Sequence, residues 1–398
     1  MPTSTDPIRI GYSLPLSGPL GGNGRSARLA HRVWAEKVNR SGGLLGRSVE
    51  LICEDDRTDA TLVPGIYSHL LDVKKVDLVI GSYGTNSLLP VMPLIIRSNR
   101  FFVGLMGVGV NQGFNYPGYF AMIPLGPDSN GALTDGFFAL AARQSAKPAT
   151  VALLSADAQF ALNPILGARS NAAKYGLHVI DERTYALGTE DFGPIIEAVA
   201  ALKPDVLLLC SYLADSIGLV RAISQSRFKP KMVGGAMIGP QNADVKVQLG
   251  PLLNGFVNYE YWAPVPSMMN DDVRSMLDEY QGLARDATVD KLGHYMAPTA
   301  YSQLQVLEHC VRETGTLEDA ALIAYARSAS FETVLGTIRF GANGEWTSPR
   351  VLQVQFRGVA EDPLDQFRQG SGQVVVSPDD LSSGALLYPY STTLPPRS

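Results

Sequence analysis

The sequence has few cysteines and few charged residues. Three cysteines occur in 398 residues, Cys53, Cys210 and Cys310, and they lie far apart without a CxxC pair. Neither a disulfide framework nor a zinc site is indicated by this spacing. Charged residues make up 18% of the chain and the net charge is −5, which leaves no basic field for phosphate backbones. We therefore expect no nucleic-acid partner.

Long hydrophobic runs are also missing. The longest, such as residues 206–210, are far shorter than the roughly 20 residues that span a bilayer, so we expect a protein that is not inserted in a membrane. The opening sequence MPTSTDP has neither the basic nor the apolar region of a signal peptide. Two interpretations stay open: a cytosolic protein, or an exported one whose signal peptide is replaced by a start methionine.

Catalytic and cofactor-binding signatures are scarce as well. The chain contains no GxSxG elbow, HExxH, P-loop or EF-hand pattern. The segment Gly104 to Gly109 superficially resembles a dinucleotide loop, but Gln112 stands where that fingerprint requires glycine. The five histidines lack the spacing of metal ligands. They are His31, His69, His178, His294 and His309. We expect no enzyme, no cofactor and no metal site.

What the sequence does contain is a repeated alternation of short apolar runs and helix-length amphipathic stretches. This alternation is typical of parallel βαβ units and predicts an α/β fold. The first series is strand 8–14, helix 26–41, strand 48–55, helix 60–73, strand 78–80, helix 88–98 and strand 101–104. The second is helix 130–143, strand 150–155, helix 163–175, strand 178–185, helix 192–202, strand 206–210, helix 216–226 and strand 231–235. Then follow strand 256–262, helices 270–285, 294–313 and 318–329, and strands 337–340, 350–356 and 373–376, with 341–344 as a β-hairpin turn.

The loops at the carboxyl ends of parallel strands are where open α/β sheets bind ligands. Residues 81–87 follow an apolar strand and lead into a helix, whose first amides predict an anion site suited to a carboxylate. Alternatively, Thr85, Asn86 or Ser87 is a simple helix cap. Residues 54–56, an acidic run at the end of the second strand, are interpreted as a solvated strand end rather than a cation site.

Several longer segments resemble one known family. They are 8–18 (IRIGYSLPLSG), 39–47 (NRSGGLLGR), 54–56 (EDD), 335–340 (LGTIRF) with Asn343-Gly344, and 384–390 (GALLYPY). Over nearly the whole chain and in this order, they resemble the leucine/isoleucine/valine-binding proteins, which are type I periplasmic binding proteins of ABC transporters. The resemblance implies two Rossmann-like lobes joined by three hinge crossings: residues 1–124 plus 257–330, and residues 125–256 plus 331–398.

The resemblance also implies a small carboxylate ligand in the interlobe cleft, hinge closure around it, and a membrane permease that reads the closed state. Carried over residue by residue, it implies ligand contacts from both lobes. In lobe one they are a carboxylate cradle at Gly84 and Thr85, the loop Met106, Gly107 and Val108, and Asn23 at a position often filled by an aromatic. In lobe two they are Phe160 in place of a common tyrosine, Tyr212 as an aromatic closing over the ligand, and Met237 and Ile238.

Met237 and Ile238 depart from the family pattern, because an acidic residue near them usually binds the ammonium of an amino acid. A buried ammonium without a carboxylate partner is costly. Unless Asp157 or Asp215 substitutes, the departure favours an aromatic or aliphatic acid without an amine over a branched-chain amino acid. Phe160, like Tyr212, has core packing as its alternative role.

Three functions are weighed on this basis. The first is a periplasmic receptor of an ABC transporter. The second is a cytoplasmic sensor of the same fold, similar to the amide-sensing regulator of amidase expression, which the missing signal peptide supports. The third, an enzyme such as a dehydrogenase or glycosyltransferase, would need a nucleotide loop after the first strand, where residues 16–22 are interrupted by Pro19.

Overall fold

The computed structural model describes residues 6–285, 287–361 and 364–393. Contacts between residues divide the chain into two compact units. Unit one comprises Met1–Pro127 and Asn270–Pro349, and unit two comprises Asp128–Met269 and Arg350–Ser398. The chain therefore passes between the units three times, as the family resemblance implies.

Two of these crossings lie later in the chain than the boundaries expected from the sequence: they follow residues 269 and 349 rather than 256 and 330. The second crossing is later because β10 (Val257–Glu260) pairs with two strands of unit two, β9 (Met232–Met237) and β13 (Leu352–Phe356). The third is later because β11 (Phe331–Thr333) and β12 (Gly336–Ile338) form a hairpin whose first strand contacts helix α10 (Ala297–Thr314) in unit one.

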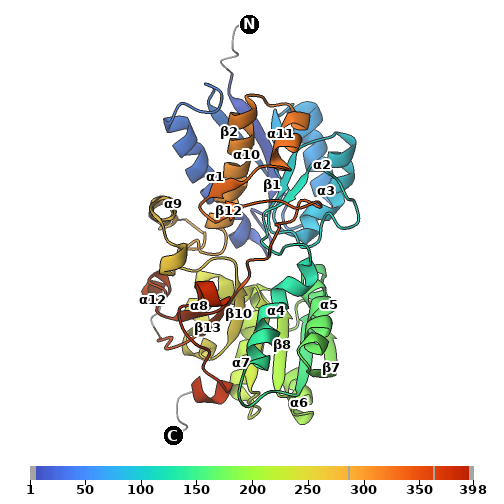
Figure 1. Cartoon of the computed structure of the whole chain (residues 1–398), viewed down its shortest axis with the longest axis vertical. Helices are drawn as coiled ribbons and strands as arrows, with labels where there is room; N and C mark the ends of the chain where they lie inside the picture. Colours follow the sequence, from blue (N-terminus) through green and yellow to red (C-terminus); the bar gives the residue numbers. More distant parts are fainter. Residues whose placement is uncertain (1–5, 286, 362–363, 394–398) are drawn as a thin grey trace. The chain divides into compact units, whose positions relative to one another are not determined.

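Unit one is built on short parallel strands flanked by helices (Figure 1). β1 (Ile8–Leu14) lies between β2 (Val49–Asp55) and β3 (Leu78–Val79), and all its residues except Arg9 are buried, as expected for a strand covered on both faces. β4 (Phe102–Gly104) and β5 (Tyr119–Ala121) form another parallel pair, and a Tyr83–Leu105 bridge links the loops after β3 and β4. The other elements are α1 (Gly21–Arg40), α2 (Val63–Ser68), the π-helix η1 (His69–Val73), α3 (Thr85–Arg97), α9 (Asp271–Ala284), α10 and α11 (Asp319–Ala326).

Helix α1 begins five residues before the helix predicted to start at residue 26. The glycines at its start favour a loop by propensity, but Gly24 packs against the chain before it: a Cβ there would lie 2.0 Å from the Pro15 carbonyl oxygen. Further along, α1 packs on α10, and the His31 Nε2 atom lies 3.0 Å from the Gln303 Oε1 atom. Tertiary packing thus outweighs glycine's low helix propensity.

Unit two contains a seven-stranded sheet in the order β14-β13-β10-β9-β8-β6-β7. The run from β10 to β7 is parallel, β13 is antiparallel to β10, and β14 is antiparallel to β13. The further strands are β6 (Thr150–Ala156), β7 (His178–Tyr185), β8 (Val206–Ser211) and β14 (Gln373–Ser377). The helices are α4 (Ser129–Ala142), α5 (Gln159–Lys174), α6 (Gly193–Ala201), α7 (Leu213–Gln225), α8 (Ala243–Leu249) and α12 (Leu364–Arg368), with 3-10 turns η2 (Gly239–Gln241), η3 (Gly250–Leu253), η4 (Pro266–Met268), η5 (Asp379–Leu381) and η6 (Tyr390–Thr393).

The hairpin predicted between residues 337–340 and 350–356 is wrong. β12 pairs with β11, which the sequence did not reveal, and β13 lies between β10 and β14 in the other unit. Residues 341–344 do form a turn, but it closes on an isolated bridge between Phe340 and Trp346. In a strand of three residues, the alternation of apolar and polar positions is too short to reveal the strand or its pairing partner from the sequence.

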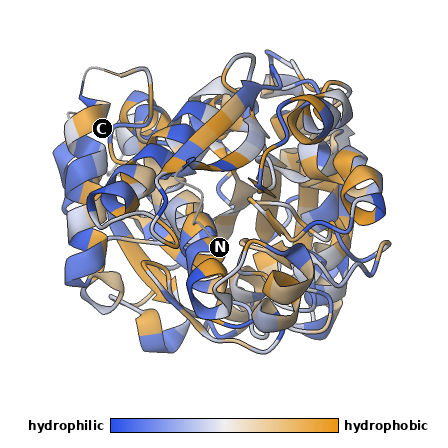
Figure 2. Ribbon diagram, turned by 90° about the horizontal axis from the view of Figure 1, so that it is seen from above, coloured by the Kyte–Doolittle hydropathy of each residue, from blue (hydrophilic) through white to orange (hydrophobic). Residues whose placement is uncertain are grey.

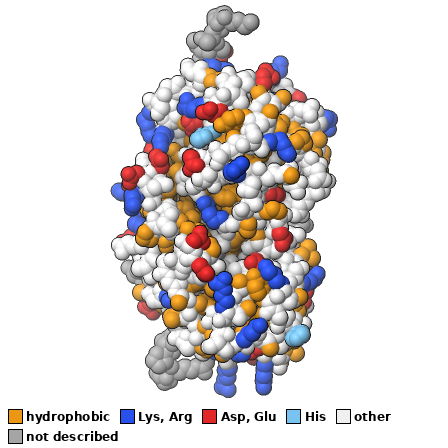
Figure 3. All heavy atoms as spheres, in the orientation of Figure 1, with side chains coloured by type: hydrophobic (Ala, Val, Ile, Leu, Met, Phe, Trp, Pro, Cys, Tyr) orange, Lys and Arg blue, Asp and Glu red, His pale blue; other side chains and the backbone are white. Residues whose placement is uncertain are grey.

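The cores follow the alternation seen in the sequence. Apolar and polar residues are both present along the helices in Figure 2, as amphipathic helices require, and Cys210 in β8 is fully buried. On the face drawn in Figure 3 the acidic and basic side chains are interspersed rather than gathered by sign. Within the described ranges, none of the helices combines the length and apolar character needed to traverse a lipid bilayer.

Candidate functional site

In unit one the carboxyl ends of three strands meet at a buried carboxylate, Asp56. It follows β2 and accepts hydrogen bonds from Ser13 Oγ in β1 at 3.2 Å and from Ser82 Oγ after β3 at 3.0 Å. Its exposed fraction is 0%, so the interpretation of the acidic run as a solvated strand end is wrong for this residue. Burial raises the pKa of Asp56, and the hydrogen bonds from Ser82, Thr58 and Ser13 oppose that shift. Asp56 therefore connects the strand ends that carry the next two loops.

The loop after β3 leads into α3 through Gly84, whose φ of 89° and ψ of 155° suit glycine. No side chain caps the N-terminus of α3, so the alternative role of Thr85, Asn86 or Ser87 as a simple cap is not realised. The first amides of a helix have no partners within the helix. This uncapped terminus is therefore suited to an anionic group.

Thr85 and the loop after β4 are joined directly. The Val108 amide donates a hydrogen bond to Thr85 Oγ1 at 3.0 Å. Met106 has a φ of 57°, an uncommon conformation for a bulky residue and one that occurs preferentially at functional sites. At Gly107 a Cβ would lie 2.5 Å from Leu88 Cδ1 in α3. Unit one thus brings Gly84, Thr85 and the Met106 to Val108 loop together.

Asn23, in the first turn of α1, belongs to a buried hydrogen-bonded row. Its Nδ2 donates to the Tyr83 hydroxyl at 3.0 Å, and that hydroxyl lies 2.9 Å from the hydroxyl of Tyr295. The Asn23 side chain is 1% exposed, and no described residue hydrogen-bonds to its Oδ1 atom. Burial raises the pKa of Tyr83, so its hydroxyl remains a donor at neutral pH. Asn23 therefore adjoins the Tyr83 to Thr85 segment through a polar contact.

Gln303 is a supporting residue that sequence reasoning missed. From α10, its Nε2 donates to the carbonyl oxygens of Gly81 at 3.0 Å and Val103 at 2.7 Å. Gly81 lies after β3 and Val103 lies within β4, so one amide holds the two segments at a fixed spacing. Gln303 lies more than 190 residues from either partner, and no local sequence signal marks it.

In unit two, Phe160 and Tyr212 are in contact. The ring centroids are 5.7 Å apart with the planes at 73°, and the Phe160 amide donates to the Tyr212 hydroxyl at 3.2 Å. Phe160 lies in the first turn of α5, and Tyr212 precedes α7. Both residues are half-buried, so neither is fully enclosed in the core.

Met237 and Ile238 are fully buried at the end of β9. The Met237 backbone is held by Asn258 in β10, which accepts from its amide at 3.0 Å and donates to its carbonyl at 2.9 Å. The Ile238 amide donates to the Ser211 carbonyl at 2.9 Å. These hydrogen bonds hold the backbone at the end of β9 in position. The side chains of Met237 and Ile238 are uncharged, so neither places a charge at this strand end.

Two buried acids of unit two, Asp215 and Glu260, already have partners. Asp215 Oδ2 accepts from the Tyr185 hydroxyl at 2.6 Å and from the Tyr212 amide at 3.1 Å. Glu260, 3% exposed, lies 3.5 Å from the buried Lys246 ammonium and accepts from Gln241 at 3.3 Å. Asp157, which was considered together with Asp215 as a partner for an ammonium, is exposed. Among the residues the structure describes, no group of three metal-binding side chains is found.

Comparison with known proteins places this geometry in a family context. A family model described as Periplasmic binding protein matches residues 7–357. A curated relative, the leucine-, isoleucine-, valine-, threonine- and alanine-binding protein of Pseudomonas aeruginosa, is 20% identical over 347 residues, which cover 86% of this chain and 88% of the relative.

Solved structures show the same fold. One is the branched-chain amino acid transporter substrate-binding protein LivJ from Streptococcus pneumoniae in complex with isoleucine, with a TM-score of 0.73, 15% identity, and coverage of 88% of this chain and 96% of that one. Another is a solute-binding protein of an ABC transporter from Rhodopseudomonas palustris in complex with 3,4-dihydroxybenzoic acid, with a TM-score of 0.72, 15% identity and 95% coverage of both chains.

Proposed function

Because the chain belongs to the periplasmic binding protein family, we propose that it is the substrate-binding protein of an ABC transporter and that its ligand is a small carboxylic acid without an ammonium group. The ligand is held by residues of both units and favours a closed state. A membrane permease then recognises that state in the periplasm. A ligand shifts such an equilibrium only by its differential affinity for the two states, so contacts from both units are essential.

The main observation that supports a ligand with a carboxylate group is the uncapped N-terminus of α3. Gly84 gives the backbone the turn that starts the helix, and, as the N-cap residue, it has no side chain to cap the first amides. Thr85 holds the adjoining loop through Val108 and keeps its own hydroxyl proton available as a donor. A ligand carboxylate would accept hydrogen bonds from these groups, as anions do at helix N-termini.

The charges in unit two support a ligand without an amine. Met237 and Ile238 bring no carboxylate to the end of β9, Asp215 is engaged by Tyr185 and Tyr212, and Glu260 is paired with Lys246. An ammonium buried here would lack a counter-charge, which is costly. The Rhodopseudomonas palustris protein, in complex with 3,4-dihydroxybenzoic acid, shows that this fold accommodates an acid without an amine.

The test compares ligands that share one carbon skeleton. Purified protein is titrated calorimetrically with leucine, with 4-methylpentanoate, which lacks only the ammonium, and with 4-methylpentanamide, which lacks both charges. Benzoate and 3,4-dihydroxybenzoate extend the series to aromatic acids. X-ray scattering with and without the best ligand reports closure.

We expect an acid of this series to bind and leucine to bind at least about tenfold more weakly, since a buried unpaired charge costs more than 1.4 kcal/mol. Tight leucine binding with no response to 4-methylpentanoate would contradict the proposed ligand class while leaving the receptor role intact. Preferential binding of the amide would favour the sensor of the same fold. Unchanged scattering at saturation would contradict closure itself.

A further inference from the structure

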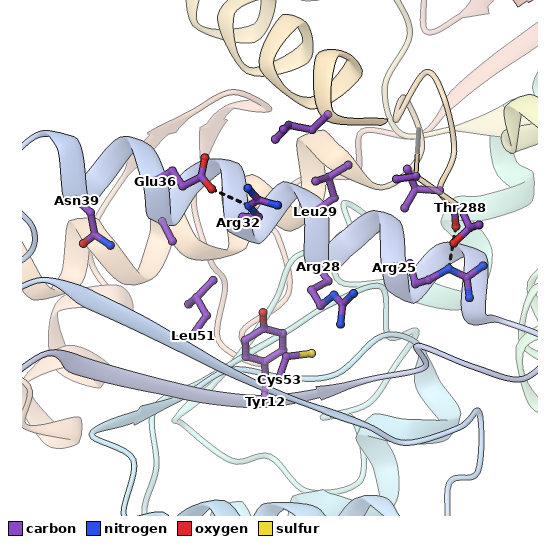
Figure 4. A pocket seen from close by; sticks show the side chains of 14 residues that line it. Tyr12, Arg25, Arg28, Leu29, Arg32, Glu36, Asn39, Leu51, Cys53 and Thr288 are labelled. Carbon is purple, nitrogen blue, oxygen red and sulfur yellow. Dashed lines mark hydrogen bonds and ion pairs between the residues drawn. The ribbon is translucent and has the colours of Figure 1, made fainter. Parts of the chain in front are cut away.

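Unit one contains a cavity beside α1, lined by a helix face other than the one that packs on α10. Its volume is about 550 Å³, within the range of small-molecule sites. The floor is formed by β1 and β2 through Tyr12, Leu51 and Cys53, and α1 runs along it (Figure 4). None of the residues expected to hold the transported ligand lines this cavity.

The charge in this cavity is mainly positive. Arg25, Arg28 and Arg32 line it from α1, and Glu36 is the one acidic residue among the described residues that line it. Spacings of three and four residues place the arginines on one helix face, where like charges repel one another. An anion bound among them would relieve that repulsion.

Two of the three guanidinium groups are already engaged. Arg25 donates to the backbone carbonyls of Thr288 at 2.7 Å and Leu16 at 2.8 Å. Arg32 pairs with Glu36 at 2.6 Å. Arg28, which is exposed, makes no hydrogen bond or ion pair with any residue that the structure describes. Its planar donor fork therefore remains available in the cavity.

A buried hydroxyl also lacks a conventional partner there. The Tyr12 side chain is 0% exposed, and no oxygen or nitrogen of a described residue hydrogen-bonds to its hydroxyl. The hydroxyl lies between the floor and α1 in Figure 4, and it interacts with the Cys53 thiol, a weak hydrogen-bond partner. A buried hydroxyl without a good acceptor is destabilising, which a ligand oxygen would correct.

From this geometry we infer that the cavity beside α1 is a second binding site, which takes a small organic anion whose carboxylate bridges the Arg28 guanidinium and the Tyr12 hydroxyl. Burial raises the pKa of Cys53 to about 12 and that of Tyr12 well above its usual value. Both groups therefore stay uncharged at neutral pH and do not repel an anion. A guanidinium and a hydroxyl together offer the several donors that a carboxylate accepts.

The apolar residues that line the cavity favour an organic anion over an inorganic one. Leu29, Leu51, Leu283 and Val289 line the same cavity, and they offer apolar surface that a phosphate or chloride ion cannot use. An aromatic or aliphatic body beyond the carboxylate would cover them. The site is distinct from the α3 terminus, and it stands whether or not the transported ligand is the one proposed above.

The probe is 4-fluorobenzoate, observed by fluorine NMR with its neutral isostere 4-fluorobenzamide as a comparison. Wild-type protein is titrated beside R28Q, Y12F, T85V and R97Q. The first two remove the cavity's donors, and T85V alters the α3 terminus instead. Arg97 is an exposed arginine of unit one that does not line the cavity, so R97Q removes the same charge elsewhere.

We expect one bound population of 4-fluorobenzoate to weaken by about tenfold or more in R28Q and severalfold in Y12F, since hydrogen bonds to charged groups are of that strength. The same population should persist in T85V and R97Q, and 4-fluorobenzamide should not populate it. The proposal is overturned if no population depends on Arg28, if R97Q weakens it equally, or if the amide binds as well. Displacement by an equal concentration of inorganic phosphate would overturn the organic nature of the ligand.

Discussion

The Val108 amide donates a hydrogen bond to the Thr85 hydroxyl oxygen across 3.0 Å, between residues 23 positions apart in the chain. This bond attaches the loop after β4 to the first residue of α3. It lets one side chain hold two loops that the sequence assigned to the ligand separately. The geometry of the α3 terminus therefore depends on Thr85 in a way that can be tested.

Replacing Thr85 with valine removes the hydroxyl while keeping the branched shape. The buried Val108 amide would lose its acceptor, and we expect the free energy of unfolding to fall by about 1 to 3 kcal/mol. Affinity for the best carboxylate should fall by at least about tenfold, because the loop and a donor are both affected. Denaturation and calorimetry measure the two effects. Thr85→Ser keeps the hydroxyl and should retain most of the affinity; unchanged stability and affinity in Thr85→Val would show that the hydrogen bond is not important.

Tyr212 offers a test of the ligand contact in unit two. Tyr212→Phe removes only the hydroxyl that accepts from the Phe160 amide, so we expect a change in affinity of about threefold or less. Tyr212→Ala also removes the ring that packs on Phe160, and aromatic contacts of this kind contribute about 0.5 to 1.5 kcal/mol beyond their buried area. Calorimetry with the acid series should therefore show a much larger loss for alanine. Unchanged affinity in Tyr212→Ala would assign the residue to packing alone.

Glu345 in unit one predicts a pH dependence of stability. Its side chain is 3% exposed, both carboxyl oxygens lack hydrogen-bond partners among described residues, and burial raises its pKa to about 8. The unfolded chain releases this proton near pH 4.3, so between about pH 4.3 and 8 the folded state binds more protons than the unfolded state. Stability contributed by this group is complete below that window and is lost as the pH rises through it.

The Glu345→Gln variant keeps the shape and cannot ionise. Relative to wild type, we expect it to gain on the order of 3 to 5 kcal/mol in unfolding free energy between pH 4 and pH 8. Urea denaturation at several pH values measures the difference between the two proteins, in which other titrating groups cancel. Parallel pH profiles for the two proteins would mean that Glu345 titrates normally.

The buried ion pair of Lys246 and Glu260 leads to a prediction about the stability of unit two. Glu260→Gln leaves the Lys246 ammonium, 2% exposed, without a counter-charge, and removing one partner of a buried pair typically costs about 3 to 5 kcal/mol. The double variant Lys246→Met with Glu260→Gln should recover much of that loss. Chemical denaturation of the single and double variants measures the coupling. Additive losses would show that the two charges do not stabilise one another.

Much of the fold could be predicted because its strands are short apolar runs bounded by turns. The predicted strands at 8–14 and 178–185 have the observed bounds of β1 and β7. Helix starts were placed too late where polar residues or glycines open the helix, as at α1 and α3, because tertiary contacts there outweigh local propensity. The pairing of β11 and β12 was missed because three-residue strands have no readable period.

The candidate site could be predicted only in part. The loop at Gly84 was predicted because it follows an apolar strand and leads into a helix, the loop at Met106 was implied by the family resemblance, and the structure joins the two through Thr85 and Val108. Asp56 was misread, since a run of acids looks solvated until Ser13 and Ser82 are brought to it by other strands. Gln303 gave no signal, because its partners are determined by helix packing across about half of the chain.

The three crossings of the chain have a consequence for biosynthesis. The first 127 residues of unit one emerge from the ribosome well before α10, which carries Gln303 to the ends of β3 and β4 and packs on α1. Unit one therefore cannot reach its final fold while the first part of unit two is being synthesised. The apolar face of α1 that packs on α10 stays exposed until α10 has been made. Such late closure slows folding, and it leaves an interval in which a chaperone can act on the incompletely folded polypeptide.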